Sequence, residues 1–357
     1  VSQLREVKAP VPFGLESRAD QPNCPSLFAP MSLLVASRVF ARGTVQRHSA
    51  RSRQCGFQKR GMSASSRGEH RGIEPLVKAR WLSDQLKSNS NIVVLDTSWF
   101  MAKDQVDVKG QYNANRIPGA QLFQVDEVCD KKTTLPHMLP TQEEFEAAVS
   151  NLGIGNDTHV VCYDTNPHFM ASARVWWMFR YFGHDKVSLV DGGLDSWIAA
   201  GLPTENLAPT AAPSPAQFKV ISVRKHLLKN LEQIKQNIKK ENFLLLDARS
   251  ANRFRGVDPE PRPGLLSGHI PGSINVPYTR VIDGLGSFNS EVKMRQLFSE
   301  LELDPDQPLA TTCGSGITAA IVAFSFHLLG KSDVALYDGS FAEYGQVSLG
   351  NKVETGL

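Results

Sequence analysis

The sequence reads Asn91-Ile-Val-Val-Leu-Asp96 in its first half and Asn242-Phe-Leu-Leu-Leu-Asp247 in its second half. Each stretch is a short apolar run that ends in a carboxylate, which is typical of a strand buried on both faces of a sheet. Three further pairs of landmarks follow in the same order. They are Arg116-Ile117-Pro118-Gly119-Ala120 with His269-Ile270-Pro271-Gly272-Ser273, His159-Val-Val-Cys-Tyr-Asp164 with Pro308-Leu-Ala-Thr-Thr-Cys313, and Val187-Ser-Leu-Val-Asp191-Gly192-Gly193 with Val334-Ala-Leu-Tyr-Asp338-Gly339-Ser340. We therefore predict that one domain of about 130 residues has been duplicated.

The segments between the landmarks predict the fold class. Helix-like segments separate the apolar strands, which is typical of an α/β fold with a mainly parallel sheet flanked by helices. We predict two such domains, at residues 73–206 and 217–345. A Pro-rich, uncharged linker at 207–216 joins them. Residues 1–72 are predicted to be a disordered extension, and residues 346–357 a flexible tail.

The formal net charge of +3 is unevenly distributed along the chain. Residues 31–70 contain eight Arg and Lys residues and one acidic residue, whereas the charges of residues 1–30 balance. The rest of the chain is therefore net acidic, so nothing in it indicates nucleic acid as a partner. No apolar run is long enough to predict a membrane-spanning helix.

The basic segment has the composition of a targeting signal. It begins at Met31, is rich in Arg and Ser, and is amphipathic if helical. This is typical of a mitochondrial transit peptide, and the alternative is a disordered basic tail. We expect residues 1–30 to lie upstream of the natural start at Met31. A start at Met62 would omit the signal and give a cytoplasmic form.

Cys313 is the strongest candidate for a chemical role. The loop Cys313-Gly314-Ser315-Gly316-Ile317-Thr318 lies between an apolar run, Leu309–Thr312, and an apolar helix-like segment, Ala319–Leu329. The partial positive charge at a helix N-terminus favours the thiolate, and the two glycines let several N–H groups point toward the sulfur. The loop predicts a nucleophile, and the alternative is a buried structural Cys.

Neighbouring positions restrict the chemistry. The five cysteines form no CxxC pair, so neither a zinc site nor a disulfide framework is indicated. Cysteine phosphatases also carry a Cys loop at a helix start, but they need Arg at the sixth position after the Cys. Ala319 occupies that position, which argues against a phosphatase. In the first half, Asp164 replaces the Cys. A carboxylate offers no thiolate nucleophile, so the N-terminal domain is predicted to be non-catalytic.

The landmarks together resemble those of the rhodanese family over about residues 73–345. Two tandem copies with Cys in the second copy alone resemble the two-domain sulfurtransferases. The neutral loop after Cys313 is similar to that of the 3-mercaptopyruvate sulfurtransferases, whereas thiosulfate sulfurtransferases have basic residues there. The resemblance implies a site in the C-terminal half, near the domain interface, that works without a metal or organic cofactor.

The resemblance also implies roles for residues outside the loop. Arg253 and Arg262 match arginines that hold the carboxylate and carbonyl of the substrate, and a guanidinium fork suits a carboxylate. Asp126 and His137 match positions opposite the Cys loop, where His would move the proton that the leaving enolate needs. The alternative for this second pair is an interdomain hydrogen bond.

The loop residues are assigned with the Cys. Ser315 is predicted to take part in catalysis or in proton transfer, the alternative being a turn residue bonded to its own backbone. The loop's remaining residues are predicted to line the substrate site, with a first-turn structural role as the alternative for Thr318. They are Gly314, Gly316, Ile317 and Thr318.

The predicted activity is the transfer of sulfur from 3-mercaptopyruvate, through a Cys313 persulfide, with release of pyruvate. Acceptors would be small thiols, reduced thioredoxin or cyanide, with hydrogen sulfide as an onward product. One alternative is a thiosulfate:cyanide sulfurtransferase. The other is a non-catalytic rhodanese-like binding module.

Several other residues are predicted to be structural. Arg255 is expected to pair with a nearby acid. The stretch Arg174-Val-Trp176-Trp177-Met-Phe-Arg180 is expected to bury a helix against a sheet rather than to bind a base. The loop at residues 166–170 has no chemical interpretation. Caps and turns that hold the fold are expected at Asp96, Asp191, Asp247, His269 and Asp338.

Overall fold

The computed structural model describes residues 73–89, 91–166, 171–206, 214–284, 286–304 and 306–356. The extension predicted for residues 1–72, with its transit peptide, lies outside these residues. So do residues 207–213 of the linker and residues 167–170 of the loop without a chemical interpretation. No helix among the described residues is long and apolar enough to cross a bilayer.

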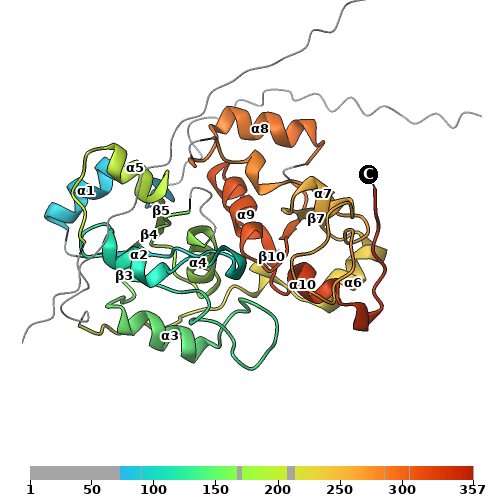
Figure 1. The fold of residues 1–357 in the computed structure, drawn as a ribbon, viewed down its shortest axis with the longest axis horizontal. Helices are drawn as coiled ribbons and strands as arrows, with labels where there is room; N and C mark the ends of the chain where they lie inside the picture. The colour runs from blue at the N-terminus through green and yellow to red at the C-terminus, as the bar shows by residue number, and fades with distance from the viewer. Residues whose placement is uncertain are drawn as a thin grey trace, which may run out of the picture. The chain divides into compact units, whose positions relative to one another are not determined.

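The first half alternates strands with helices (Figure 1). Its strands are β1 (Leu76–Val77), β2 (Ile92–Asp96), β3 (Gln121–Leu122), β4 (His159–Tyr163) and β5 (Val187–Val190). Its helices are α1 (Ala79–Ser88), α2 (Val108–Ala114), α3 (Gln142–Asn151), α4 (Ser172–Tyr181) and α5 (Gly193–Ala199).

The second half repeats the alternation. Its strands are β6 (Leu228–Lys229), β7 (Leu244–Asp247), β8 (Ile274–Asn275), β9 (Leu309–Thr312) and β10 (Ala335–Tyr337). Its helices are α6 (Leu231–Lys240), α7 (Ala251–Phe254), α8 (Glu291–Glu300), α9 (Thr318–Leu328) and α10 (Ser340–Tyr344).

The two sheets have the same topology. The strand orders are β1-β5-β4-β2-β3 and β6-β10-β9-β7-β8, and all pairs of these strands are parallel. The C-terminal ends of β4 and β9 are at equivalent places, since Asp96 pairs with Tyr163 and Asp247 with Thr312. The predicted fold class is therefore confirmed. Asp164 and Cys313 follow equivalent strand ends.

Local sequence signals start several of the helices. Thr141 and Glu144 form a capping box at α3, in which each side chain bonds the other's backbone N–H. Asn230 and Gln233 do the same at α6. These side chains satisfy N–H groups that have no partner inside the helix.

Side chains alternate between the two faces of each sheet. In the first half, Val94 and Val161 pack under α1 and α5, whereas Leu95 and Val160 pack under α3 and α4. The second half has the same two layers, with α6 and α10 on one face and α8 and α9 on the other. This arrangement follows from the period of two in a strand.

The α4 and α9 layers form one continuous core across the two halves. The Trp176 ring on α4 meets the Phe324 ring on α9 edge to face, with centroids 4.8 Å apart. The expectation for α4 was that it packs against a sheet rather than binds a base. The structure adds the helix of the other domain, because eight of the ten residues of α4, Arg174 among them, are buried.

The C-terminal segment differs from the flexible tail predicted for it. The Glu354 N–H and carbonyl exchange hydrogen bonds with His269, and the Gly356 N–H donates to the Arg255 carbonyl. The Tyr344 hydroxyl donates to the Lys352 carbonyl. Polar composition suggested disorder, but the backbone of this segment finds partners on the domain itself.

Candidate active site

Cys313 lies directly after β9, and α9 begins five residues later. Its backbone is held by α10, since its N–H donates to Ser340 Oγ (3.3 Å) and its carbonyl accepts from the Phe341 N–H (3.0 Å). Its side chain is 2% exposed, and the Gly316 N–H donates to Sγ at 3.2 Å. The sulfur therefore lies near the N-terminal end of α9, with one N–H donor already in place.

The two glycines of the loop are required for different reasons. Gly316 has φ +80°, in the left-handed region that favours glycine. At Gly314 the limit is space, because an added Cβ would lie 2.9 Å from Nη2 of Arg253. A side chain at Gly314 would displace the guanidinium from the loop.

The other loop residues lie in different environments. Ser315 is buried beside the Cys, and Thr318 is the partly exposed first residue of α9. The Ile317 side chain belongs to the apolar core, so this residue can face a ligand in the loop through its backbone alone.

Arg253 is held by a buried carboxylate. Its Nη2 lies 2.5 Å from Oε2 of Glu260, whose Oε1 lies 2.7 Å from Nη1 of Arg249. Arg249 in turn pairs with Asp247 at 2.6 Å, and both side chains are fully buried. The sequence did not single out Glu260. It fixes the direction in which Arg253 can point.

Arg262 is arranged differently from Arg253. It forms no hydrogen bond or ion pair with any residue that the structure describes, and it borders a hollow of about 290 Å³. Burial lowers the pKa of Arg262, and negative charge on Cys313, Glu260 and Asp126 opposes that shift. This guanidinium is therefore electrostatically close to the sulfur and has hydrogen-bonding capacity left for an anion.

Asp126 and His137 lie together. Oδ1 of Asp126 is 2.7 Å from Nδ1 of His137, and Oδ2 accepts from Nε1 of Trp99 (2.7 Å). Burial raises the pKa of Asp126, but its contacts with His137 and Trp99 outweigh burial and the net pKa is lowered. The buried Nε2 of His137 has no hydrogen-bond partner among the described residues. The carboxylate orients the imidazole, and Nε2 remains available.

Tyr278 is a further residue of the site that the sequence did not indicate. Burial raises the pKa of its hydroxyl, with Arg253 lowering it and Cys313 raising it. The Tyr278 N–H donates to the Ala248 carbonyl (3.1 Å), and the Ala248 N–H donates to the Thr312 carbonyl (2.8 Å) next to Cys313. No motif marks such a residue, because it comes from a short turn after β8.

Asp164 occupies the position of the nucleophile in the first half. Its side chain is buried and accepts from the N–H groups of Asn166 (2.7 Å) and Ala171 (3.0 Å). Burial raises its pKa to about 8, against the effect of these hydrogen bonds. The carboxyl group closes its own loop and presents no nucleophilic sulfur.

Asp164→Asn is expected to flatten the pH dependence of stability. A carboxyl whose folded-state pKa lies above its unfolded value stabilises the fold at low pH and loses that contribution as pH rises through the folded pKa. As the pH rises from about 5.5 to 8.5, this group therefore lowers the free energy of unfolding of the wild type by about 3 kcal/mol. Urea denaturation at the two pH values measures the difference. Asp84→Asn, on the exposed face of α1, is the control and should keep the wild-type slope.

The residues expected to hold the fold do so, with one correction. Asp96 accepts from the Tyr163 hydroxyl (2.9 Å), and Nδ1 of His269 bonds the Phe254 carbonyl (2.8 Å). Arg255 was expected to pair with an acid, but it donates to Oδ1 of Asn252 (2.8 Å) instead. Asn252 lies on α7, three residues before Arg255, so one helical turn brings this amide rather than a carboxylate within its reach.

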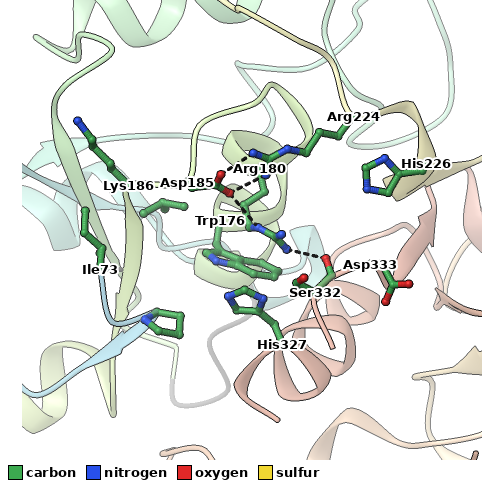
Figure 2. A pocket seen from close by; sticks show the side chains of 12 residues that line it. Ile73, Trp176, Arg180, Asp185, Lys186, Arg224, His226, His327, Ser332 and Asp333 are labelled. Atoms are coloured by element: carbon green, nitrogen blue, oxygen red, sulfur yellow. Dashed lines mark hydrogen bonds and ion pairs between the residues drawn. The ribbon is translucent and has the colours of Figure 1, made fainter. Parts of the chain in front are cut away.

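A second cavity, of about 640 Å³, lies where the C-terminal ends of α4 and α9 meet (Figure 2). The arginines that line it are held by other groups. Arg224 and Arg180 both pair with Asp185, and Arg180 also donates to the Ser332 carbonyl (3.1 Å). The cavity therefore lacks the unpaired guanidinium and the sulfur that distinguish the Cys313 site.

Comparison with known proteins agrees with this arrangement. The model of the rhodanese-like domain matches residues 78–200 and 230–346. The 3-mercaptopyruvate sulfurtransferase of Homo sapiens is 41% identical over 273 residues, covering 75% of this chain and 91% of that protein. The thiosulfate sulfurtransferase of Rattus norvegicus is 40% identical over 275 residues, covering 75% and 91%.

Solved structures give the same result. The crystal structure of SseA from Escherichia coli, described as a 3-mercaptopyruvate sulfotransferase with the rhodanese fold, aligns with a TM-score of 0.68 and 31% identity. The alignment covers 76% of this chain and all of that chain. The Tum1 protein of Saccharomyces cerevisiae aligns with a TM-score of 0.69 and 30% identity, covering 75% and 93%.

The chain belongs to the rhodanese family and carries two rhodanese-like domains. It is a sulfurtransferase of that family, as the sequence predicted.

Proposed function

We propose that the chain takes sulfur from 3-mercaptopyruvate, carries it as a persulfide on Cys313 and passes it to a thiol or to cyanide. The observation that carries this proposal is that one site contains both a buried Cys313 sulfur, which accepts a hydrogen bond from an N–H, and the guanidinium of Arg262, which has no ion-pair partner among the described residues. The first suits a sulfur nucleophile, and the second suits a donor that bears a carboxylate.

The proposed first step balances without an external oxidant. The Cys313 thiolate attacks the donor's thiol sulfur, and an S–S bond forms. The donor's C–S bond breaks, and its electron pair stays on carbon as the enolate of pyruvate. The proton of the donor thiol moves to that carbon, which leaves pyruvate and an anionic persulfide. An acceptor thiolate or cyanide then takes the outer sulfur and restores the Cys313 thiolate.

His137 and Ser315 are proposed to move the proton. Nε2 of His137 has no hydrogen-bond partner among the described residues, and Oδ1 of Asp126 lies 2.7 Å from Nδ1 on the other side of the ring. A neutral imidazole in this orientation can accept a proton at Nε2 and return it. Ser315, buried in the loop, is the hydroxyl that we propose links the donor to this base.

The two arginines are proposed to divide the binding of the donor. Arg253 is fixed by Glu260 against Gly314, so it addresses the donor's carbonyl beside the sulfur. Arg262 binds the carboxylate, because its guanidinium borders an open hollow and forms no ion pair with a carboxylate among the described residues. Gly314 and Gly316 let the donor approach the loop backbone.

Arg262→Gln is expected to lower kcat/KM for 3-mercaptopyruvate by about 10- to 100-fold, because a charge-assisted hydrogen bond contributes about 1.5–3 kcal/mol. The change should fall mainly on KM, since the carboxylate is bound equally before and during the reaction. Steady-state pyruvate formation measures both parameters. Arg255→Gln, in the same segment but bonded to Asn252, should keep wild-type values. Equal losses in both variants would contradict the assignment.

The alternative donor is thiosulfate. Identity with the relatives does not distinguish the two donors, because a mercaptopyruvate and a thiosulfate enzyme match at 41% and 40%. The loop supports mercaptopyruvate, since residues 314–319 carry no cationic side chain to neutralise a dianion. Parallel assays of pyruvate from mercaptopyruvate and thiocyanate from thiosulfate test this. A higher kcat/KM with thiosulfate would overturn the donor assignment.

The acceptor and the location of the protein belong to the same proposal. Small thiols, thioredoxin and cyanide fit as acceptors because each can attack a persulfide sulfur. A second thiol that attacks the resulting thiol persulfide forms a disulfide and releases hydrogen sulfide. We propose a mitochondrial location. It is supported by the Arg-rich segment after Met31 and by a relative from Arabidopsis thaliana whose name describes it as mitochondrial.

A further inference from the structure

A buried ion pair joins the two halves next to the Cys313 loop. Nη2 of Arg174, on α4, lies 2.6 Å from Oδ1 of Asp338, which follows β10. The Arg174 side chain is 0% exposed and that of Asp338 is 5% exposed. Burying two charges costs several kcal/mol, and well-packed apolar residues often replace such a pair without loss of stability. Stabilisation of the contact between the two domains therefore does not by itself explain why an ion pair is buried at this position.

The pair holds the segment that carries the base. Nη2 of Arg174 donates to the His137 carbonyl at 2.5 Å, and Oδ2 of Asp338 accepts from the Leu139 N–H at 2.8 Å. His137 has φ +60°, a left-handed conformation that costs a non-glycine residue free energy. Such a conformation persists where its surroundings fix it from several sides. The ion pair supplies two of these restraints.

The same pair also packs against the loop of the nucleophile. Nη1 of Arg174 lies 3.5 Å from the Gly316 carbonyl oxygen. A Cβ added at Gly316 would lie 3.1 Å from that Nη1 and 3.0 Å from the Asp338 carbonyl oxygen. Gly316 is the residue whose N–H donates to the Cys313 sulfur. The Arg174 guanidinium thus contacts the backbone of His137, the proposed base, and the backbone of Gly316, whose N–H bonds the Cys313 sulfur.

We propose that Arg174 and Asp338 are positioning residues that fix His137 of the first domain relative to the Cys313 loop of the second. This inference rests on the proposed roles of His137 and Cys313. It assigns the non-catalytic domain a task, which is to bring its base to the nucleophile through one planar fork. Lys cannot replace Arg here, because a single ammonium does not span the two carbonyl oxygens and the carboxylate.

The test compares four variants: Arg174→Lys, Arg174→Met, Asp338→Asn and the double variant Arg174→Met/Asp338→Asn. Arg180→Met is the matched control, since Arg180 also extends from α4 and contacts the second half at the Ser332 carbonyl (Figure 2). Sulfur transfer is measured over a range of donor concentrations, and Cys313 alkylation by iodoacetamide is measured without donor.

The two Arg174 single variants should lose on the order of 100-fold in kcat, with KM changing less than about threefold, because misplacement of a catalytic group lowers the rate more than binding. Cys313 alkylation should slow in both. Arg180→Met should keep wild-type kcat and alkylation. The double variant leaves no buried charge unpaired, so it should regain thermal stability without regaining kcat.

Two results would overturn the proposal. One is wild-type kcat in the double variant, which would show that the Arg174–Asp338 ion pair only holds the two domains together. The other is full activity in Arg174→Lys. Failure of the proposed function is recognised separately, because the wild type would then form no pyruvate. In that case thiosulfate serves as the donor, and alkylation, which needs no donor, still reports on the loop.

Discussion

Replacement of Cys313 with Ser is expected to abolish sulfur transfer, with a loss of at least about 10⁴-fold in kcat/KM. The reason is chemical, because a hydroxyl at this position cannot be oxidised to a persulfide and is a weak nucleophile toward sulfur. The fold should persist, since the side chain makes one hydrogen bond, from the Gly316 N–H, and Ser accepts the same bond. Pyruvate formation from 3-mercaptopyruvate is the measurement.

Cys129→Ser is the control for this variant. Cys129 is half-buried near Asp126, and burial raises the pKa of its thiol, which disfavours the reactive thiolate. The control should keep near wild-type activity. If Cys313→Ser kept residual turnover that disappeared when Cys129 was also replaced, Cys129 would be the cysteine that carries the sulfur. That result would contradict the account.

Arg249→Met is expected to lower the free energy of unfolding by about 3–5 kcal/mol. The fully buried Arg249 pairs with Asp247 and Glu260 and stacks 3.8 Å from the Phe341 ring centroid. Its removal leaves two buried carboxylates short of a cation, which is the costly way to break an ion-pair network. Chemical denaturation of the whole chain measures the loss.

Arg295→Met is the matched surface control. Arg295 pairs with Glu291 along α8 with both side chains about half exposed, so its loss should cost less than about 0.5 kcal/mol. A comparable effect in the two variants would show that the buried network contributes little. Arg249→Met should also reduce sulfur transfer. Glu260 holds Arg253, and without Arg249 the Glu260 carboxylate would no longer be fixed in place.

The sequence was sufficient to predict the fold, and it singled out the loop at Cys313 as the candidate site. The repeated strand endings at Asp96 and Asp247 are local patterns, and the structure places them at paired positions of two identical topologies. The Cys313 loop is likewise a local pattern, and a Gly-rich turn before an apolar helix needs no distant residue to be recognised. The pairing of Asp126 with His137 came from the resemblance, and the structure shows the contact.

The long-range ion pairs could not be predicted in the same way. Arg174 and Asp338 lie 164 positions apart, and neither has a periodic signature that names its partner. The Arg174 stretch looked like a packing helix because its neighbours are aromatic, and Asp338 looked like a turn residue. The C-terminal segment was misjudged for a related reason. Its backbone hydrogen bonds to His269 and Arg255 leave no trace in its composition.

The most direct test is to treat the purified protein with 3-mercaptopyruvate without an acceptor and determine the mass of the intact chain and its peptides. The account predicts the gain of one sulfur atom, located on the peptide that contains Cys313 and removed by cyanide. Pyruvate release without that added mass, or sulfur found on Cys162 or Cys129 instead, would contradict it.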